Sequence, residues 1–172
     1  SVIVPVFNGG HYLSKLIESL IDKNKDIVDA MEIILVNDGS TDDSSVYCEK
    51  LALEIKQIKY FSKQNGGIAS ARNYGLKYAT GHFITFCDQD DMVQKAYMPF
   101  IEVMQRNHCE TLISDVTVSQ DGILRKQNRI VLDEVCDLNG INSLVRFYIG
   151  GRKFPLKYRL EQEINVPNSI WN

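Results

Sequence analysis

The acidic segment Asp88-Gln89-Asp90-Asp91 carries the side chains with the most specific chemistry in the sequence. In an extended chain, residues two apart point to the same side, so Asp88 and Asp90 can face one point while Gln89 faces away. Two carboxylates held close together repel each other unless a cation neutralises them. Mg²⁺ and Mn²⁺ prefer such hard oxygen ligands and complete their coordination with substrate phosphates. The spacing therefore predicts a divalent-metal site at Asp88 and Asp90, although an isolated DxD is more often a solvated acidic loop, and Asp91 could equally cap a helix.

Three other positions combine residue types that suit an anionic nucleotide. Asp38 precedes a glycine, and Asp-Gly is the ordinary turn between a strand and a helix. Its carboxylate could also accept a hydrogen bond from the imide N–H of uracil, and we expect both roles. Gly66-Gly67 lets the backbone approach a ligand, and the helix that follows offers free N–H groups to an anion. Arg72 in that helix could contact a diphosphate or a base, or could be a surface arginine.

The elements that must position these residues follow from the apolar pattern. Short β-branched segments alternate with segments in which apolar residues recur at helical spacing. We predict strands over residues 1–7, 31–36, 58–61, 82–87 and 111–118, and helices over 13–21, 42–55, 68–79 and 95–107. Strand starts recur every ~25–30 residues, the length of a βαβ repeat. The pattern predicts an α/β fold with a mostly parallel central sheet flanked by helices.

The candidate residues all follow predicted strands. Phe7 and Asn8 lie at the end of the first strand, and Asp38 follows the second, Gly66 the third and Asp88 the fourth. Open parallel sheets bind ligands in the crevice beyond the carboxyl ends of their strands. We therefore expect the segments around residues 7, 38, 72 and 90 to meet at one cleft.

Composition narrows the classes of function. The 172 residues carry a net charge of -3, which argues against a nucleic-acid binder because phosphate-backbone affinity needs a basic surface. The cysteines form no CxxC pair, which favours a reducing compartment. No apolar run approaches the ~18 residues that cross a bilayer, and no signal peptide is visible. We expect a cytoplasmic protein, compatible with peripheral association at the inner face of the membrane.

Four segments together resemble glycosyltransferase family 2: Pro5–Asn8 (PVFN), Val36–Asp42 (VNDGSTD), Gly66–Gly75 (GGIASARNYG) and Phe86–Asp91 (FCDQDD). Each motif alone is weak, but their order and spacing across about residues 1 to 100 are specific to this family. The C-terminal segment Asn168–Asn172 is similar to one in bacterial members that build capsule, lipopolysaccharide or other cell-surface glycans.

The resemblance implies a Rossmann-like GT-A fold, a nucleoside-diphosphate sugar donor (a UDP-sugar above all), a divalent Mn²⁺ or Mg²⁺ ion, and inversion at the anomeric carbon. Asp90 would be the direct metal ligand, and Asp88 would contact the ribose or metal-bound water. Asp38 would hold the base and Arg72 would sit at the donor site. The remaining donor-binding candidates are Pro5, Val6, Phe7, Asn8, Gly66, Gly67 and Gln89, of which Pro5 and Phe7 would line the nucleoside pocket.

The resemblance also divides the chain. Residues 1–118 would form the donor-binding region, and 119–172 would begin an acceptor-side region that the sequence leaves incomplete. In the family, the general base is usually an acidic residue beyond the Trp-Asn segment, so Glu161 and Glu163, which precede Trp171, do not take this role and the catalytic base stays unknown. We expect a metal-dependent inverting glycosyltransferase acting on a glycan or lipid-linked acceptor; the alternative is a non-catalytic module that binds nucleotide sugars. A nucleotidyltransferase would need a basic Gly-rich loop after the first strand, which Asn8–His11 is not.

Overall fold

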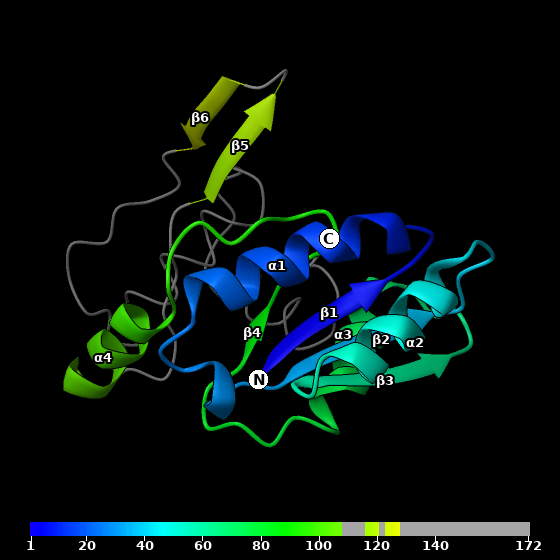
Figure 1. The fold of residues 1–172 in the computed structure, drawn as a ribbon, viewed down its shortest axis with the longest axis horizontal. Helices are drawn as coiled ribbons and strands as arrows, with labels where there is room; N and C mark the ends of the chain where they lie inside the picture. The colour runs from blue at the N-terminus through cyan, green and yellow to red at the C-terminus, as the bar shows by residue number, and fades with distance from the viewer. Residues whose placement is uncertain (108–115, 121–122, 128–172) are drawn as a thin grey trace, which may run out of the picture. The chain divides into compact units, whose positions relative to one another are not determined.

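Strands β1 (Val2–Val6) and β2 (Ile33–Asp38) form the centre of a four-stranded parallel sheet in the computed structural model, which describes residues 1–107, 116–120 and 123–127. Strand β3 (Ile58–Lys63) pairs with β2, and the short β4 (Thr85–Phe86) pairs with β1, giving the order β3-β2-β1-β4. Their carboxyl ends lie at the same edge of the sheet because all the pairings are parallel (Figure 1). The predicted parallel sheet is confirmed.

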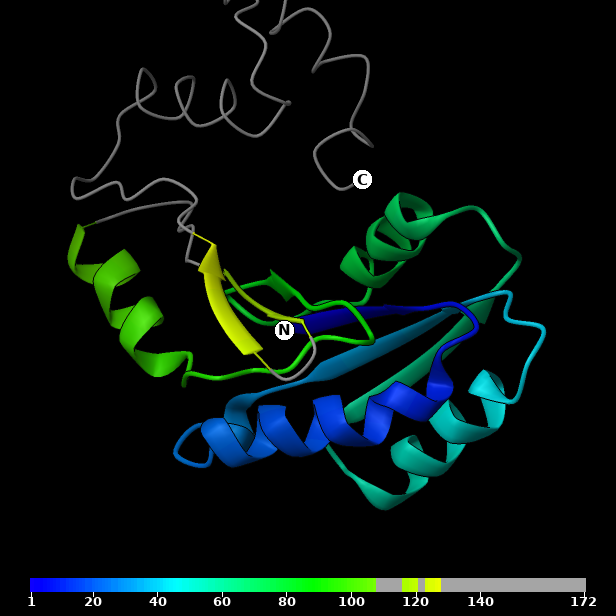
Figure 2. The same cartoon turned by 90° about the horizontal axis from the view of Figure 1, so that it is seen from above.

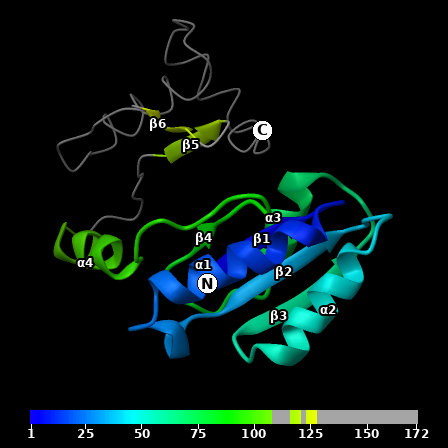
Figure 3. The same ribbon diagram turned by 45° about the horizontal axis from the view of Figure 1, so that its top comes forward.

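Helices cover both faces of this sheet. Helices α1 (Leu13–Lys23) and α2 (Ser44–Glu54) lie on one face, and α3 (Ile68–Leu76) lies on the other (Figure 2). The same arrangement of α1 and α2 beside the strands is visible in the tilted view of Figure 3. Side chains of a strand alternate between the two faces, so Val2 and Val4 pack under α1, whereas Ile3 packs under α3.

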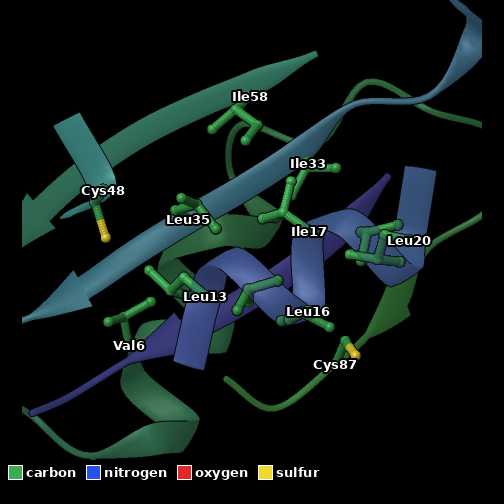
Figure 4. Packing of buried hydrophobic residues seen from close by; sticks show 12 residues of the cluster. Val6, Leu13, Leu16, Ile17, Leu20, Ile33, Leu35, Cys48, Ile58 and Cys87 are labelled. Atoms are coloured by element: carbon green, nitrogen blue, oxygen red, sulfur yellow. The ribbon is translucent and has the colours of Figure 1, made fainter. Parts of the chain in front are cut away.

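The larger buried cluster explains why α1 forms. Leu13, Leu16, Ile17 and Leu20 recur at helical spacing and are fully or almost fully buried against β1 and β2 (Figure 4). Cys48 of α2 belongs to the same cluster. Burying each large aliphatic side chain contributes about 1.5–3 kcal/mol, so this apolar stripe is a principal source of stability for the sheet-helix layer.

On the other face, α3 packs closely because its inward residues are small. Ala71 is fully buried, and a Cβ atom built at Gly75 would lie 2.5 Å from Cγ2 of Ile3. A glycine is therefore needed at position 75 for the helix to approach β1. This close approach also carries Arg72 towards the sheet, where it is 7% exposed.

Several boundaries differ from the predictions. Asn37 and Asp38, predicted to be turn residues, are the last residues of β2, and the turn begins at Gly39, whose φ is +71°. Strand β3 runs on to Lys63, because each residue from Ile58 to Lys63 has a register partner in β2. Helix α2 begins at Ser44 with Asp43 as its N-cap residue, two residues later than predicted, so the caps that the sequence offers at Thr41 or Asp42 are not used.

The chain divides into two compact units, Ser1–Ile101 and Glu102–Asn172. The second unit contains most of α4 (Met98–Asn107) and an antiparallel pair of β5 (Val116–Gln120) with β6 (Ile123–Gln127). The predicted strand over 111–118 overlaps β5, whereas β6 was not predicted, since Ile123-Leu124-Arg125-Lys126-Gln127 has only two apolar residues. The sequence also favours a turn at Asp121-Gly122, a strand over 130–132 and a helix over 139–149. These segments, and the acceptor-side segment beyond them, lie outside the described residues. None of the helices in the described parts is both long and apolar enough to cross a lipid bilayer.

Candidate functional site

A pocket of about 370 Å³ opens at the carboxyl edge of the sheet. The residues that line it come from the ends of β1 and β2, from the loops after β1, β3 and β4, and from the start of α3: Pro5, Val6, Phe7, Asp38, Asn65, Gly67, Ile68, Asp88, Gln89 and Asp90. The structure thus brings the segments around residues 7, 38 and 90 to one hollow, as the crevice argument predicts for an open parallel sheet.

Asp38 lines this pocket, with a side chain that is only 3% exposed. Its Oδ1 accepts hydrogen bonds from Nζ of Lys63 at 2.5 Å and from the backbone N–H of Gly66 at 3.0 Å. Lys63 is the last residue of β3, and Gly66 belongs to the segment that joins β3 to α3. Asp38 therefore fixes the loop before α3 as well as lining the pocket, and Gly66 serves as its donor without lining the pocket itself.

Lys63 was missed by the sequence prediction. It is the last residue of β3 and the register partner of Asp38, so the two charges stand directly opposite each other on neighbouring strands. The predicted third strand ended at residue 61, two residues too early, and this hid the pairing. If the ends of the second and third strands had been aligned so that their opposite charges face each other, the pairing of Asp38 with Lys63 would have been visible in the sequence.

The start of α3 forms another wall of the pocket. Gly67 precedes the helix with φ of +85°, a backbone conformation that glycine adopts without strain. Gly67 and Ile68 both line the pocket. The unpaired N–H groups of a first helical turn favour an anion, so this wall suits a phosphate group.

Arg72 reaches the site through Asp88 rather than by lining the pocket. Its Nη2 donates a hydrogen bond to Oδ1 of Asp88 at 2.6 Å, and its guanidinium carbon lies 5.7 Å from the ring centroid of Phe86. The arginine side chain is 8% exposed, whereas that of Asp88 is 43% exposed. The interpretation of Arg72 as a surface arginine is therefore wrong, and its charge is directed at the acidic segment.

The acidic segment is a turn and not an extended strand. The N–H of Asp91 donates to the carbonyl oxygen of Asp88 at 3.0 Å, which closes the turn over Gln89 and Asp90. For this reason the prediction that Gln89 faces away is wrong: Asp88, Gln89 and Asp90 all line the pocket. Asp91 does not cap a helix, since the next helix begins at Met98.

The side chain of Gln89 joins the acidic turn to the end of β1. Its Oε1 accepts a hydrogen bond from the N–H of Phe7 and its Nε2 donates to the carbonyl oxygen of Phe7, both at 3.0 Å. The amide thus continues the pairing of β4 with β1 by means of a side chain. The fit against Gly9 is tight, because a Cβ atom there would lie 2.3 Å from Nε2 of Gln89.

Asn8 holds two loops together and does not line the pocket. Its φ is +49°, and its Oδ1 accepts a hydrogen bond from the N–H of Thr41 at 2.8 Å. The N–H of Asn8 donates to Oγ of Ser40 at 3.0 Å. Next to it, Oγ of Ser44 accepts from the N–H of Gly10 at 2.8 Å. These bonds attach the loop after β1 to the loop after β2, which indicates a structural contribution of Asn8 to the site.

The electrostatics of the acidic turn suit a cation. The pKa of Asp91 is raised, first because its carboxyl is partly shielded from water and then by the negative charges of Asp88 and Asp90. Asp90 is exposed, and among the described residues its carboxylate has no hydrogen-bond or ion-pair partner. Those residues contain no group of three or more His, Cys, Asp or Glu side chains that could hold a metal by themselves. The donor set therefore fits an Mg²⁺ or Mn²⁺ ion that takes part of its shell from a diphosphate, and does not fit a cage formed by protein ligands alone.

The comparison with known families decides the classification. The family model described as "Glycosyl transferase family 2" matches residues 1–162. The chain belongs to glycosyl transferase family 2. The resemblance predicted from the PVFN, VNDGSTD, GGIASARNYG and FCDQDD segments is thereby confirmed.

Relatives within the family include two bacterial proteins. The minor teichoic acid biosynthesis protein GgaB of Bacillus subtilis is 47% identical over 96 residues, which are 55% of this chain and 11% of GgaB. The glycosyltransferase GlyG of Streptococcus pneumoniae serotype 4 is 31% identical over 165 residues, which are 95% of this chain and 48% of GlyG. The chain thus spans less than half the length of either relative.

Solved structures agree with the fold. S. aureus TarS 1-349 in complex with UDP superposes with a TM-score of 0.54 at 30% identity, covering 62% of this chain and 32% of that one. The complex of the same protein with UDP-GlcNAc gives 0.53 at 32% identity, covering 62% and 31%. The parallel sheet with flanking helices is accordingly the GT-A arrangement predicted from the resemblance.

Proposed function

We propose that this chain is the donor-binding part of an inverting, metal-dependent glycosyltransferase that moves a sugar from a nucleoside-diphosphate sugar to a glycan or lipid-linked acceptor. The single observation that carries the proposal is the pocket at the carboxyl edge of the sheet. There a buried carboxylate, a helix start and an acidic turn line one hollow of about 370 Å³. A nucleotide sugar presents a base, a diphosphate and a sugar, and these three features match its chemistry.

The nucleoside would occupy the side formed by β1 and β2. Pro5 and Phe7 give this wall an apolar surface, and Asp38 provides a carboxylate that can accept a hydrogen bond from a base N–H. The TarS complexes with UDP and UDP-GlcNAc support a uridine nucleotide as the donor moiety. Val6 completes the lining of this part of the pocket, whereas Gly67 lines the α3 side, where the diphosphate would lie.

The diphosphate would lie between the start of α3 and the acidic turn. Asp90, together with Asp88, would hold a divalent cation, which supplies the positive charge that stabilises a leaving nucleoside diphosphate. Arg72 holds Asp88 in place through their hydrogen bond. Gln89 holds the turn against Phe7, so that Asp90 faces the pocket.

Inversion requires an acceptor hydroxyl to attack the anomeric carbon from the face opposite the leaving group, with a general base that removes its proton. In this proposal, residues 1–118 bind the donor and residues 119–172 begin the acceptor side. The family resemblance suggests an acidic residue as the base, in the acceptor-side part of the full protein.

A thermal-shift titration with UDP and Mn²⁺ tests the proposal. A ligand at 100 times its Kd stabilises the folded state by about 2.7 kcal/mol, so the melting temperature of the chain should rise. Asp90→Ala should abolish the part of the rise that depends on Mn²⁺. Asp22→Ala is the matched control, because Asp22 lies on α1 in an exposed pair with Lys25 and should leave the rise unchanged. Equal stabilisation of the parent and Asp90→Ala would remove Asp90 from the metal site, and no response to any nucleotide would overturn the function.

A further inference from the structure

Asp38 and Lys63 form a cross-strand ion pair at the edge of the pocket. They end β2 and β3 and are register partners, and Nζ of Lys63 lies 2.5 Å from Oδ1 of Asp38. The two side chains are 3% and 16% exposed, so solvent screens this pair far less than it screens a surface pair. Lys63 does not line the pocket, whereas its partner Asp38 does.

The lysine side chain is itself held in one position. Its Nζ donates a second hydrogen bond to the carbonyl oxygen of Gln64 at 2.5 Å. The backbone of Gly66 packs beside it, since a Cβ atom at Gly66 would lie 3.0 Å from Nζ. The ammonium group is thus confined between the Asp38 carboxylate and the loop before α3.

The hydrogen bonds at Asp38 are distributed unequally. Oδ1 accepts from Lys63 and from the N–H of Gly66, whereas Oδ2 accepts only the longer contact of 3.2 Å from the same N–H among the described residues. An ionised carboxylate has about four acceptor positions and no donor. Oδ2 therefore keeps the capacity to accept a hydrogen bond from a group in the pocket that Asp38 lines.

We propose that Lys63 is a positioning residue that sets the nucleobase preference of this pocket: it holds Asp38 as a pure acceptor, so that bases with a ring N–H, such as uracil, bind better than cytosine. The inference rests on the proposed nucleotide function. Uracil presents N3–H to an acceptor, whereas N3 of cytosine is an acceptor and faces an acceptor-only carboxylate unfavourably. Without the ammonium group, the Asp38 carboxylate loses one of the hydrogen bonds that fix Oδ1 and can turn away from the pocket, which removes the discrimination.

Isothermal titration of UDP and CDP against the whole chain measures the preference as the ratio of their Kd values. The parent should bind UDP at least about tenfold more tightly than CDP, the value of one hydrogen bond to a charged group. Lys63→Met should bring the ratio close to one, and Lys63→Arg should restore most of it. Lys59→Met is the matched control, because Lys59 pairs with Glu32 at the opposite end of the same strands and should leave the ratio unchanged.

A second measurement uses the parent chain alone and does not depend on the folding of any variant. UDP methylated at N3 lacks the ring N–H and should bind about tenfold more weakly than UDP. Equal binding of UDP and N3-methyl UDP, or an unchanged UDP-to-CDP ratio in a folded Lys63→Met, would overturn the assignment of Lys63 while leaving the nucleotide function intact. Failure of the parent to bind any nucleotide would instead overturn the proposed function and the inference together.

Discussion

Asp88 and Asp90 stand two residues apart and line the same pocket, yet their surroundings differ. Asp88 accepts a hydrogen bond from the buried Arg72, whereas Asp90 is exposed and lacks a partner among the described residues. A carboxylate that is already paired with a guanidinium is a weaker ligand for a cation than one that is not. The difference supports Asp90 as the principal metal ligand in the proposed function, with Asp88 in an orienting position beside it.

Gln89 offers a test of how the acidic turn is held. Replacing it with Glu keeps the size of the side chain but removes the donor to the carbonyl oxygen of Phe7. We expect Gln89→Glu to cost about 0.5–1.5 kcal/mol of stability, because water can partly replace this exposed hydrogen bond, and to weaken UDP binding several-fold by displacing the turn. Urea unfolding and calorimetric titration give the two quantities.

Gln89→Glu also adds a negative charge near the pocket. The control for this charge is Gln64→Glu, which makes the same substitution in the exposed loop before α3. If both variants weaken UDP binding equally, repulsion of the diphosphate explains the loss, and the amide of Gln89 has no positioning role.

Residue types predicted which carboxylates line the pocket better than they predicted the contacts between side chains. The sequence pointed to Asp38, Asp88 and Asp90, because carboxylates after strands are visible in one dimension. The pair of Asp38 with Lys63 and that of Gln89 with Phe7 depend on strand register and on a turn, which a one-dimensional pattern does not contain.

At the scale of elements, the packing of α3 on β1 fixes where the pocket wall stands. Gly75→Ala should destabilise the chain by about 1–3 kcal/mol, since the new methyl group would lie 2.5 Å from Cγ2 of Ile3. Helix propensity alone predicts the opposite sign, a gain of up to about 1 kcal/mol. The free energy of unfolding in urea decides between them. In an Ile3→Ala background the cost of Gly75→Ala should shrink, and an undiminished cost would place the clash elsewhere.

Glu32 links elements at the other end of the sheet. Burial acts to raise the pKa of its carboxyl, but hydrogen bonds from Lys59, from Oγ of Ser1 and from Thr80 outweigh burial, and the pKa lies well below its usual value of 4.5. A depressed pKa contributes stability above 4.5 that is lost as the pH falls through the folded-state value. The stability difference between the parent and Glu32→Gln should therefore be full at pH 7 and shrink below pH 4.5, as followed by urea unfolding. A difference that stays constant down to pH 3 would contradict the depressed pKa.

The strands and helices themselves were largely predictable, because burial imposes a regular spacing on the apolar residues of the sequence. Val2, Ile3 and Val4 alternate between two helical layers, and the stripe of α1 repeats at helical spacing, so strands and helices were recognisable. The residues at which the strands end were harder to predict. Strand β4 pairs over only two residues where six were predicted, and β2 continues through polar Asn37 and Asp38, because pairing with neighbouring strands and not hydrophobicity sets where a strand ends.

At the scale of the molecule, the buried clusters and the pocket belong to the same part of the chain. All residues of both clusters and all residues that line the pocket lie between Val2 and Tyr97, within the first compact unit. Donor binding, in the proposed function, is therefore a property of this unit. In the same proposal, transfer to an acceptor also requires the acceptor side, which residues 119–172 begin.

This separation predicts that a protein of residues 1–107 folds and binds nucleotide by itself. It retains the four-stranded sheet, helices α1 to α3 and α4 up to Asn107, so it should unfold cooperatively in urea, as domains of this size usually do. Its Kd for UDP in the presence of Mn²⁺ should match that of the 172-residue chain within about threefold, or ~0.7 kcal/mol, because no described pocket residue has been removed. The same Asp90→Ala substitution should abolish the Mn²⁺-dependent part of binding in both proteins. A folded 1–107 protein that fails to bind UDP, beside a longer chain that binds it, would show that residues beyond 107 complete the nucleotide site.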